Sequence, residues 1–197
     1  MNKERLIVVS GASSGIGRHI AETASSCGFE VIGLSRSKVN SNFTSIECDI
    51  SNHDEVKLFF KSIKKKTNFS SLINAAGIAS MNLFLSTPAD KMEEIMKTNV
   101  LGTMYCSQHA LKIFARTKSD NHSSIINFST IAVPLALKGE SVYVASKGAV
   151  EAFSRSLARE ASDFNCNVNT IAPGPIDTNL INKIADQKID AIVRRQI

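Results

Sequence analysis

Tyr143 and Lys147 are the residues whose types and spacing most directly indicate chemistry. They lie four positions apart in Tyr-Val-Ala-Ser-Lys, at the start of an expected helix over residues 142–164. An α-helix completes a turn in about 3.6 residues, so this spacing places a phenol and an ammonium on one face. A neighbouring cation favours the phenolate and lowers the pKa of the phenol. The pair is a candidate general acid for carbonyl reduction, although the same spacing also occurs in exposed helical pairs.

A glycine-rich turn follows the first expected strand and reads Gly-Ala-Ser-Ser-Gly-Ile-Gly, starting at Gly11. Gly11 can adopt the backbone angles of a sharp turn, and Gly15 and Gly17 let a ligand approach the backbone closely. The free amides of the following helix attract a pyrophosphate, to which the hydroxyls of Ser13 and Ser14 can add contacts. Its position directly after a strand favours a dinucleotide cradle over a tight turn without a ligand.

The end of the second expected strand bears on the choice of dinucleotide. A carboxylate at this point would hold the ribose hydroxyls of NAD and repel the additional phosphate of NADP. The position carries Ser35, followed by Arg36, whose guanidinium can pair with a phosphate. We therefore expect NADP(H), with NAD(H) possible. The alternative is that Arg36 is an ordinary surface residue.

The composition indicates one globular domain. The chain has 197 residues, 43% hydrophobic and 21% charged. It has no apolar run of the roughly 18 residues that span a bilayer and no signal-peptide pattern. Its four cysteines are widely spaced, which predicts reduced, mostly buried thiols in a cytoplasmic protein without a metal site. The densest basic cluster, at 64–66, falls at an expected helix end, so we expect a solvated terminus and no nucleic-acid or membrane partner.

Short apolar runs alternate with longer amphipathic segments, which predicts a doubly wound α/β parallel sheet (a Rossmann fold). No linker or repeat divides the chain, so residues 1–197 form a single domain. The segment 36–44 is too short for a crossover helix and predicts a loop or a single turn. Strands are expected over residues 6–10, 30–34, 45–49, 71–75, 123–129 and 167–172, and helices over 15–27, 53–66, 89–98, 100–118 and 142–164.

Taken in this order, these features resemble the short-chain dehydrogenases/reductases, in particular the core-length branch of the 3-oxoacyl-acyl-carrier-protein reductases. The resemblance extends over essentially the whole chain and implies an oxidoreductase that interconverts a ketone and a secondary alcohol. It rests on Gly11-x-x-x-Gly15-x-Gly17, Cys48-Asp49, Asn74-Ala-Ala-Gly77, Asn99, Tyr143-x-x-x-Lys147 and Pro173-Gly174.

The resemblance implies a role for each matching residue. Tyr143 would protonate the carbonyl oxygen as hydride arrives from the nicotinamide. Lys147 would hold the nicotinamide ribose and lower the pKa of Tyr143, and Asn99, where the family bends a helix to seat a water, would continue the proton relay. Cofactor contacts are implied for Tyr143, Lys147 and a further set: Gly11, Ser13, Ser14, Gly15, Ile16, Gly17, Ser35, Arg36, Asp49, Ile50, Asn74, Ala75, Gly77, Pro173, Gly174, Ile176 and Thr178.

The resemblance assigns some of these residues to the adenosine end of the cofactor and others to the nicotinamide end. Asp49 would bind the adenine amino group, and Asn74, Ala75 and Gly77 would support the adenosine half. For Asn74 a mainly architectural role is an equal alternative. Contacts to the nicotinamide and its carboxamide are implied for four residues after the sixth strand: Pro173, Gly174, Ile176 and Thr178.

The chain departs from the family at the hydroxyl that orients the substrate. The family usually has a Ser thirteen residues before the Tyr, often the second of a Ser-Ser pair, whereas this chain has Ser129-Thr130. Thr130 keeps a donor and acceptor hydroxyl but adds a methyl group and a stiffer side chain. We expect Thr130 to polarise the carbonyl in a sterically tighter site. Alternatively, Thr130 is a strand-end residue and Ser129 points elsewhere.

The family usually continues beyond its sixth strand through a substrate loop and a helix to a seventh strand, whereas this sequence ends at Ile197. We expect a longer natural chain, because the sixth strand would otherwise be an exposed edge. In the family the helix that carries the Tyr and the one that begins near Val100 form a dimer interface. We therefore expect a homodimer or homotetramer through small and apolar residues, namely Ala145, Ala149, Ala152, Phe153 and Leu157.

Two functions follow from these expectations. The first is an NADP(H)-dependent oxidoreductase acting on a 3-oxoacyl thioester, a keto sugar or another small ketone. The second is a dinucleotide-binding sensor or assembly subunit with little turnover, supported by Thr130 and the early chain end. A partly hydrophobic substrate is favoured by an apolar lining: Phe128, Ala132, Val133, Pro134 and Leu135.

Overall fold

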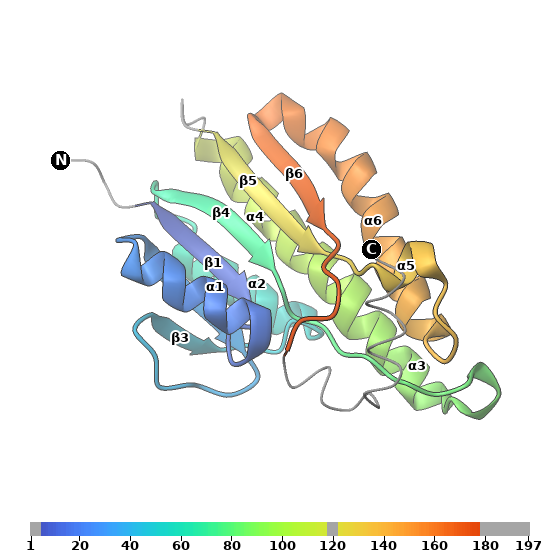
Figure 1. The fold of residues 1–197 in the computed structure, drawn as a ribbon. Coiled ribbons are helices and arrows are strands. Elements are labelled where there is room, and N and C mark those ends of the chain that lie inside the picture. Colours follow the sequence, from blue (N-terminus) through green and yellow to red (C-terminus); the bar gives the residue numbers. More distant parts are fainter. Residues whose placement is uncertain (1–4, 118–121, 178–197) are drawn as a thin grey trace.

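Six parallel strands pair in the order β3-β2-β1-β4-β5-β6 in the computed structural model, which describes residues 5–117 and 122–177 (Figure 1). The order reverses between β1 and β4, because the chain first winds outward to β3 and then to β6. This arrangement confirms the doubly wound parallel sheet. The strands are β1 (Leu6–Ser10), β2 (Glu30–Ser35), β3 (Thr44–Glu47), β4 (Phe69–Asn74), β5 (Ser123–Phe128) and β6 (Cys166–Ile171).

Helices cover both faces of this sheet (Figure 1). The helices α2, α4 and α6 pack on one face and α1 packs on the other. The α-helices are α1 (Gly15–Ser26), α2 (His53–Ile63), α3 (Ala89–Met96), α4 (Thr103–Thr117), α5 (Ala132–Leu135) and α6 (Ser141–Ala161). The other helical elements are the π-helix η2 (Lys97–Gly102) and two 3₁₀ turns, η1 (Phe84–Ser86) and η3 (Ser162–Phe164).

The strand β1 shows why the apolar runs are continuous. All five of its residues are buried. Leu6 and Val8 point into the core under α2, α4 and α6, whereas Ile7 and Val9 point into the core under α1. Successive side chains of a strand face opposite sides, so a strand covered on both faces needs apolar residues at every position.

Several expected boundaries were wrong. The strand expected over 45–49 is β3, which runs over Thr44–Glu47 and so ends two residues earlier than expected. The break expected between two helices at Asn99 is instead η2, which joins α3 and α4 without interruption. At the start of α4 the Thr103 hydroxyl donates to the carbonyl of Asn99 in η2 at 2.8 Å, which supports the wider turn. The short helix α5 was not expected at all.

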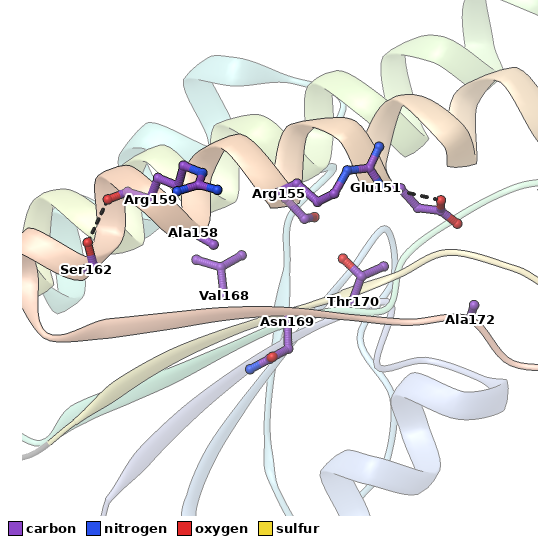
Figure 2. A pocket seen from close by; sticks show the side chains of 10 residues that line it. Glu151, Arg155, Ala158, Arg159, Ser162, Val168, Asn169, Thr170 and Ala172 are labelled. Atoms are coloured by element: carbon purple, nitrogen blue, oxygen red, sulfur yellow. Dashed lines mark hydrogen bonds and ion pairs between the residues drawn. The ribbon is translucent and has the colours of Figure 1, made fainter.

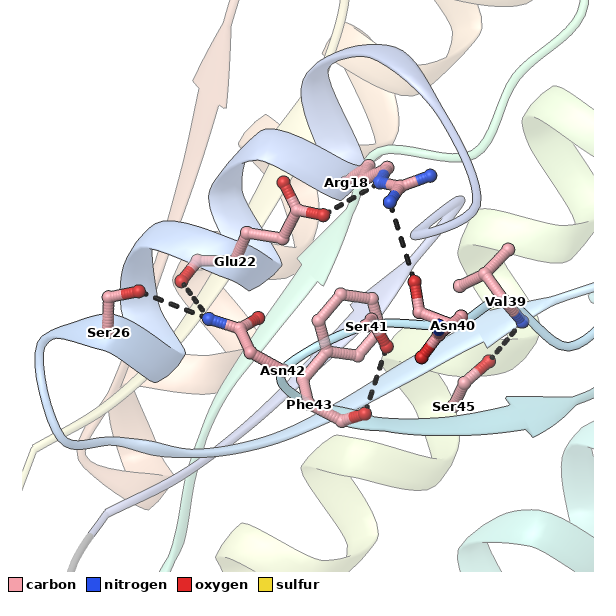
Figure 3. A network of polar contacts seen from close by, with 9 residues as sticks. All are labelled: Arg18, Glu22, Ser26, Val39, Asn40, Ser41, Asn42, Phe43 and Ser45. Atoms are coloured by element: carbon pink, nitrogen blue, oxygen red, sulfur yellow. Dashed lines mark hydrogen bonds and ion pairs between the residues drawn. The ribbon is translucent and has the colours of Figure 1, made fainter.

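The loop between β2 and β3 is the structure expected for residues 36–44. Figure 3 shows that it is held against α1 by several polar contacts. The Asn42 amide donates to the Glu22 carbonyl at 3.2 Å, and the Ser25 hydroxyl donates to the Asn42 carbonyl at 2.6 Å. Beneath them, Phe43 packs on Gly33, where an added Cβ would lie 2.4 Å from the ring. The loop is therefore fixed beside the end of β2.

The expectations about which residues are exposed and which are buried were confirmed in part. The basic cluster lies just after α2, where Lys66 forms an ion pair with Glu30. Cys48, Cys106 and Cys166 are buried as expected, whereas Cys27 is exposed. Leu157 packs in the core between α6 and the sheet, so it does not belong to the free face for which it was proposed. No helix in the described ranges is both long enough and apolar enough to span a bilayer.

Candidate active site

The parallel sheet gathers the residues of interest at one edge. Each strand is followed directly by one of the expected site segments, and the carboxyl ends of parallel strands lie together. The turn after β1 and the segment after β4 flank the point where the strand order reverses. A crevice at this point is where ligands bind in doubly wound sheets.

The N-terminus of α1 has free amides, unlike that of α2. Ser14 caps α1 in an extended conformation and makes no side-chain capping hydrogen bond. In α2, by contrast, the Asn52 side chain accepts from the amides of Asp54 and Glu55 at 3.0 and 3.4 Å. The first turn of α1 therefore offers amides and a dipole to an anion, which fits a bound pyrophosphate.

The glycines of the turn serve packing as much as ligand approach. Gly11 has φ +75°, and an added Cβ would lie 2.6 Å from Ala76 Cα. A Cβ on Gly17 would lie 2.4 Å from the Gly11 carbonyl oxygen. The expectation that Gly17 is small for the sake of a ligand was therefore incomplete, because the protein's own turn already excludes a side chain there.

At the end of β2, Arg36 is exposed to solvent and Ser35 is buried. The Ser35 hydroxyl is buried and donates to the Ser37 carbonyl at 2.7 Å. Arg36 is exposed, and in the described part of the chain no hydrogen bond or ion pair occupies its guanidinium. Arg36 thus remains available for an anion at this edge, whereas the proton of the Ser35 hydroxyl is engaged within the loop.

Asp49 and Ile50 lie between β3 and α2. One carboxylate oxygen of Asp49 accepts from the amide and hydroxyl of Ser51, at 2.9 and 2.8 Å. Ile50 is buried against Gly102 of η2, where an added Cβ would lie 2.7 Å from Ile50 Cδ1. Both side chains are held at the sheet edge.

Asn74 takes part in a buried network of side-chain hydrogen bonds. Its amide donates to Ser107 of α4 at 3.1 Å and to the Asn127 side chain at 2.8 Å. Asn127 then donates to Ser154 of α6 at 2.8 Å. These contacts join two neighbouring strands to two helices, which supports the architectural alternative for Asn74.

Asn99 lies within η2 and is completely buried. Its side-chain amide donates to the Ile78 carbonyl at 2.9 Å and to the Ser146 hydroxyl at 3.0 Å, and its side-chain oxygen accepts from the Ile78 amide at 2.8 Å. An added Cβ on Gly77 would lie 3.3 Å from both Asn99 Oδ1 and Lys147 Nζ. The segment after β4, the helix bend and α6 therefore meet at one point.

The Thr130 hydroxyl lies close enough to the Tyr143 phenol to lower its pKa, so the hydroxyl that departs from the family pattern does face the phenol. The Thr130 oxygen also accepts from the Ala132 amide at 3.2 Å. Lys147 lies one turn further along α6, where its ammonium donates to the Phe128 carbonyl at 2.8 Å. The ammonium is 5.9 Å from the centre of the Tyr143 ring.

The pKa of Tyr143 is raised in this structure, not lowered as its spacing from Lys147 suggested. Burial raises the pKa of Tyr143 to about 12; the hydrogen bond with Thr130 opposes this rise and the Glu140 carboxylate adds to it. Burial also lowers the pKa of Lys147 to about 8. Desolvation disfavours both charged forms, so it outweighs the attraction expected from the spacing alone.

The chain is similar in sequence to known proteins over most of its length. A model of the family described as short chain dehydrogenase matches residues 5–189 of the chain. The chain belongs to this family. Carbonyl reductase family member 4 of Danio rerio is 33% identical over 194 residues, covering 93% of this chain and 80% of the relative.

Two further proteins are similar to this chain over most of their length. The 3-oxoacyl-acyl-carrier-protein reductase of Bos taurus is 31% identical over 196 residues, covering 93% of this chain and 81% of the relative. The solved structure of ligand-free Thermoplasma acidophilum aldohexose dehydrogenase has a TM-score of 0.86 at 31% identity, covering 98% of this chain and 78% of that one. The chain therefore has the fold of an oxidoreductase family.

The remaining residues expected to contact the cofactor lie after β6 in the chain. The Ile131 amide donates to the Pro173 carbonyl at 3.1 Å, which ties the end of β6 to the segment after β5. Gly174 is half-buried beside it, and Ile176 is 43% exposed. Thr178 lies outside the described residues. Within those residues, no group of three His, Cys, Asp or Glu side chains is placed to hold a metal ion.

One residue of the site was missed from the sequence. The Ser129 hydroxyl donates to Glu151 on α6 at 2.5 Å. Glu151 lies at the Ala172 end of an open groove of about 750 Å³ between α6 and β6 (Figure 2). The positions 143, 147 and 151 are four apart, so the helical period could have placed Glu151 on the face of Tyr143.

Proposed function

We propose that the chain is an NADP(H)-dependent oxidoreductase that reduces a ketone to a secondary alcohol. The observation that carries the proposal is the meeting of Tyr143, Thr130 and Lys147 on the carboxyl edge of the sheet, beside the open amides of α1. A reduced nicotinamide dinucleotide bound there would supply the hydride. The turn at Gly11, the first turn of α1, Asp49 and Arg36 would hold its phosphates and adenosine, and Lys147 its nicotinamide ribose.

In this proposal the chain's own residues move the proton. The Thr130 hydroxyl orients the carbonyl oxygen of the substrate, and the Tyr143 phenol donates a proton to it. A pKa near 12 keeps the phenol protonated at neutral pH, which suits reduction. Alcohol oxidation needs the phenolate and should become faster as the pH rises. Lys147, with a pKa near 8, carries a charge near neutral pH that would stabilise the phenolate left after proton transfer.

The choice of NADP(H) is supported by Arg36, whose guanidinium has no partner among the described residues, and by the presence of Ser35 where a carboxylate would favour NAD(H). Because the Ser35 hydroxyl is engaged by Ser37, the preference rests on Arg36. NAD(H) is the alternative. The names of the similar proteins suggest substrate classes, namely a 3-oxoacyl thioester or a sugar, besides another small ketone.

We also propose that the protein is a homodimer or homotetramer. Ala145 and Ala152 are exposed on α6, and Leu101 is 39% exposed on η2, so small and apolar side chains remain on the surface expected for the interface. Light scattering at micromolar concentration should give at least twice the monomer mass. A monomer at this concentration would contradict the proposal.

A panel of ketones with NADPH tests the function directly. The absorbance of NADPH should fall in the presence of a 3-oxoacyl thioester, a keto sugar or a small ketone. A sensor or assembly subunit would instead change the fluorescence of NADPH without consuming it. Binding without turnover across the panel would reject the proposed reaction.

A further inference from the structure

Three contacts, one for each turn, join α6 to the end of β5. The Tyr143 phenol faces the Thr130 hydroxyl, Lys147 donates to the Phe128 carbonyl, and Glu151 accepts from the Ser129 hydroxyl. Residues four apart lie on one face of a helix. The three consecutive residues at the end of β5 are therefore each held from the same side.

Ser129 is the most tightly fixed of the three. It is 3% exposed, its amide donates to the Ile171 carbonyl at 2.8 Å and its hydroxyl donates to Glu151 Oε1 at 2.5 Å. Hydrogen bonds to a carboxylate are shorter and about twice as strong as those between neutral groups. The hydroxyl of Ser129 is therefore occupied and does not compete with that of Thr130.

The other oxygen of Glu151 has a weaker contact. It lies 3.8 Å from Arg155 Nη1, and the Arg155 side chain is 72% exposed. Ion pairs between exposed side chains contribute little. Glu151 itself is only 25% exposed in its side chain, so its main attachment is the buried hydroxyl of Ser129.

We propose that Glu151 is a positioning residue of the active site. By holding Ser129, it fixes the end of β5 so that the Thr130 hydroxyl faces Tyr143, and it keeps the Ser129 hydroxyl away from a bound carbonyl. Glu151 touches neither substrate nor coenzyme in this scheme. The effect on catalysis rests on the proposed function, whereas the effect on Tyr143 does not.

The chain contains two tyrosines, which makes a direct measurement possible. In a Tyr105→Phe protein labelled with ¹³Cζ-tyrosine, the single resonance reports on the hydrogen bond of Tyr143. Glu151→Ala and Ser129→Ala should each move this resonance in the same direction as Thr130→Val. Glu151→Gln, which still presents an acceptor oxygen, and Arg155→Ala should leave it in place.

Kinetics in the same variants give a second, separate measurement. Glu151→Ala and Ser129→Ala should each lower kcat about 10- to 100-fold, because small misplacements of reacting groups have effects of this size. The dissociation constant of NADPH should change by less than about twofold, and the double variant should be no slower than the slower single one. Glu151→Gln should retain most of the turnover and Arg155→Ala all of it.

The outcomes separate the two proposals. If the wild type reduces no ketone but the resonance moves as expected, the proposed function fails and the positioning role stands. If Glu151→Ala and Ser129→Ala keep both the resonance and kcat while Thr130→Val changes them, the positioning role is wrong. Should Glu151→Ala fail to fold, Ser129→Ala carries the same test, because it removes a single hydroxyl.

Discussion

The two halves of the sheet contribute to the candidate site in different ways. The half formed by β1, β2 and β3 presents backbone amides at the start of α1 and an exposed Arg36. In this half, Ser10 and Ser35 are the buried polar side chains of the described residues. Its shape is set by backbone turns in which Gly11 and Gly17 leave no room for a Cβ.

The half formed by β4, β5 and β6 buries its polar side chains. Asn74, Asn99, Asn127, Ser129 and Lys147 are all at least 95% buried, and each is bonded to a neighbouring element. Such groups are costly to bury unless they are hydrogen-bonded, so their partners must be positioned together. The comparison teaches that the first half is suited to holding an anion and the second to holding a few side chains in fixed positions for chemistry.

Replacing Tyr143 should give the largest effect on turnover with the least effect on cofactor binding, and so should distinguish the roles of the two halves most clearly. Tyr143→Phe should lower kcat about 10³-fold, since a positioned general acid contributes about 10² to 10⁴. Fluorescence titration should show that NADPH binding changes by less than about threefold, because the amides of α1 are untouched. Equal losses of binding and turnover would contradict the division of roles.

The buried ammonium of Lys147 predicts a pH-dependent stability. Its pKa falls from 10.5 to about 8 on folding, so the unfolded chain holds the proton more strongly between these values. The stability that this group adds is therefore present above about pH 10.5 and is lost as the pH falls from there to about 8. In urea unfolding, wild type should gain up to about 3 kcal/mol over Lys147→Met between pH 7 and pH 10.5. A difference that does not change with pH would show that the ammonium is solvated.

Thr130 tests whether the second half depends on one hydroxyl. Thr130→Val should lower kcat about 10²-fold, as the loss of an oxyanion donor does. Thr130→Ser keeps the hydroxyl and should remain within about threefold of wild type in steady-state assays. An unchanged rate in Thr130→Val would remove this residue from the mechanism.

Gly17 tests the backbone of the first half. In Gly17→Ala the new Cβ would meet the Gly11 carbonyl oxygen at 2.4 Å, which should cost about 1–3 kcal/mol of stability and weaken NADPH binding. Turnover at saturating NADPH should be retained. Gly148→Ala on α6 is the matched control, because its nearest neighbour would be 4.0 Å away. Its melting temperature should not fall.

Arg36 should give the smallest effect. Arg36→Ala should reduce the preference for NADPH over NADH about tenfold, which corresponds to about 1.4 kcal/mol. The neighbouring exposed Lys38 provides the control variant Lys38→Ala, whose preference should not change. If wild type prefers NADH by tenfold or more, the assignment of NADP(H) is wrong.

Local sequence patterns determined the elements and much of the site's placement. The alternation of apolar runs and amphipathic segments predicted six strands, because strands covered on both faces need apolar residues throughout. The glycines after β1 predicted the turn, because few other residues adopt its backbone angles. These features depend on neighbours in sequence, so they can be inferred without coordinates.

The tertiary structure decided the features that depend on distant residues. The sequence could not show that Asn99 lies in a continuous π-helix, because its partner Ile78 is twenty-one positions away. The spacing of Tyr143 and Lys147 suggested a lowered phenol pKa, whereas burial by the whole fold raises it. Likewise, Glu151 becomes the partner of Ser129 only because α6 packs against β5. The sequence alone determined which groups are present and on which element they lie, and three-dimensional packing decided their partners, solvation and charge.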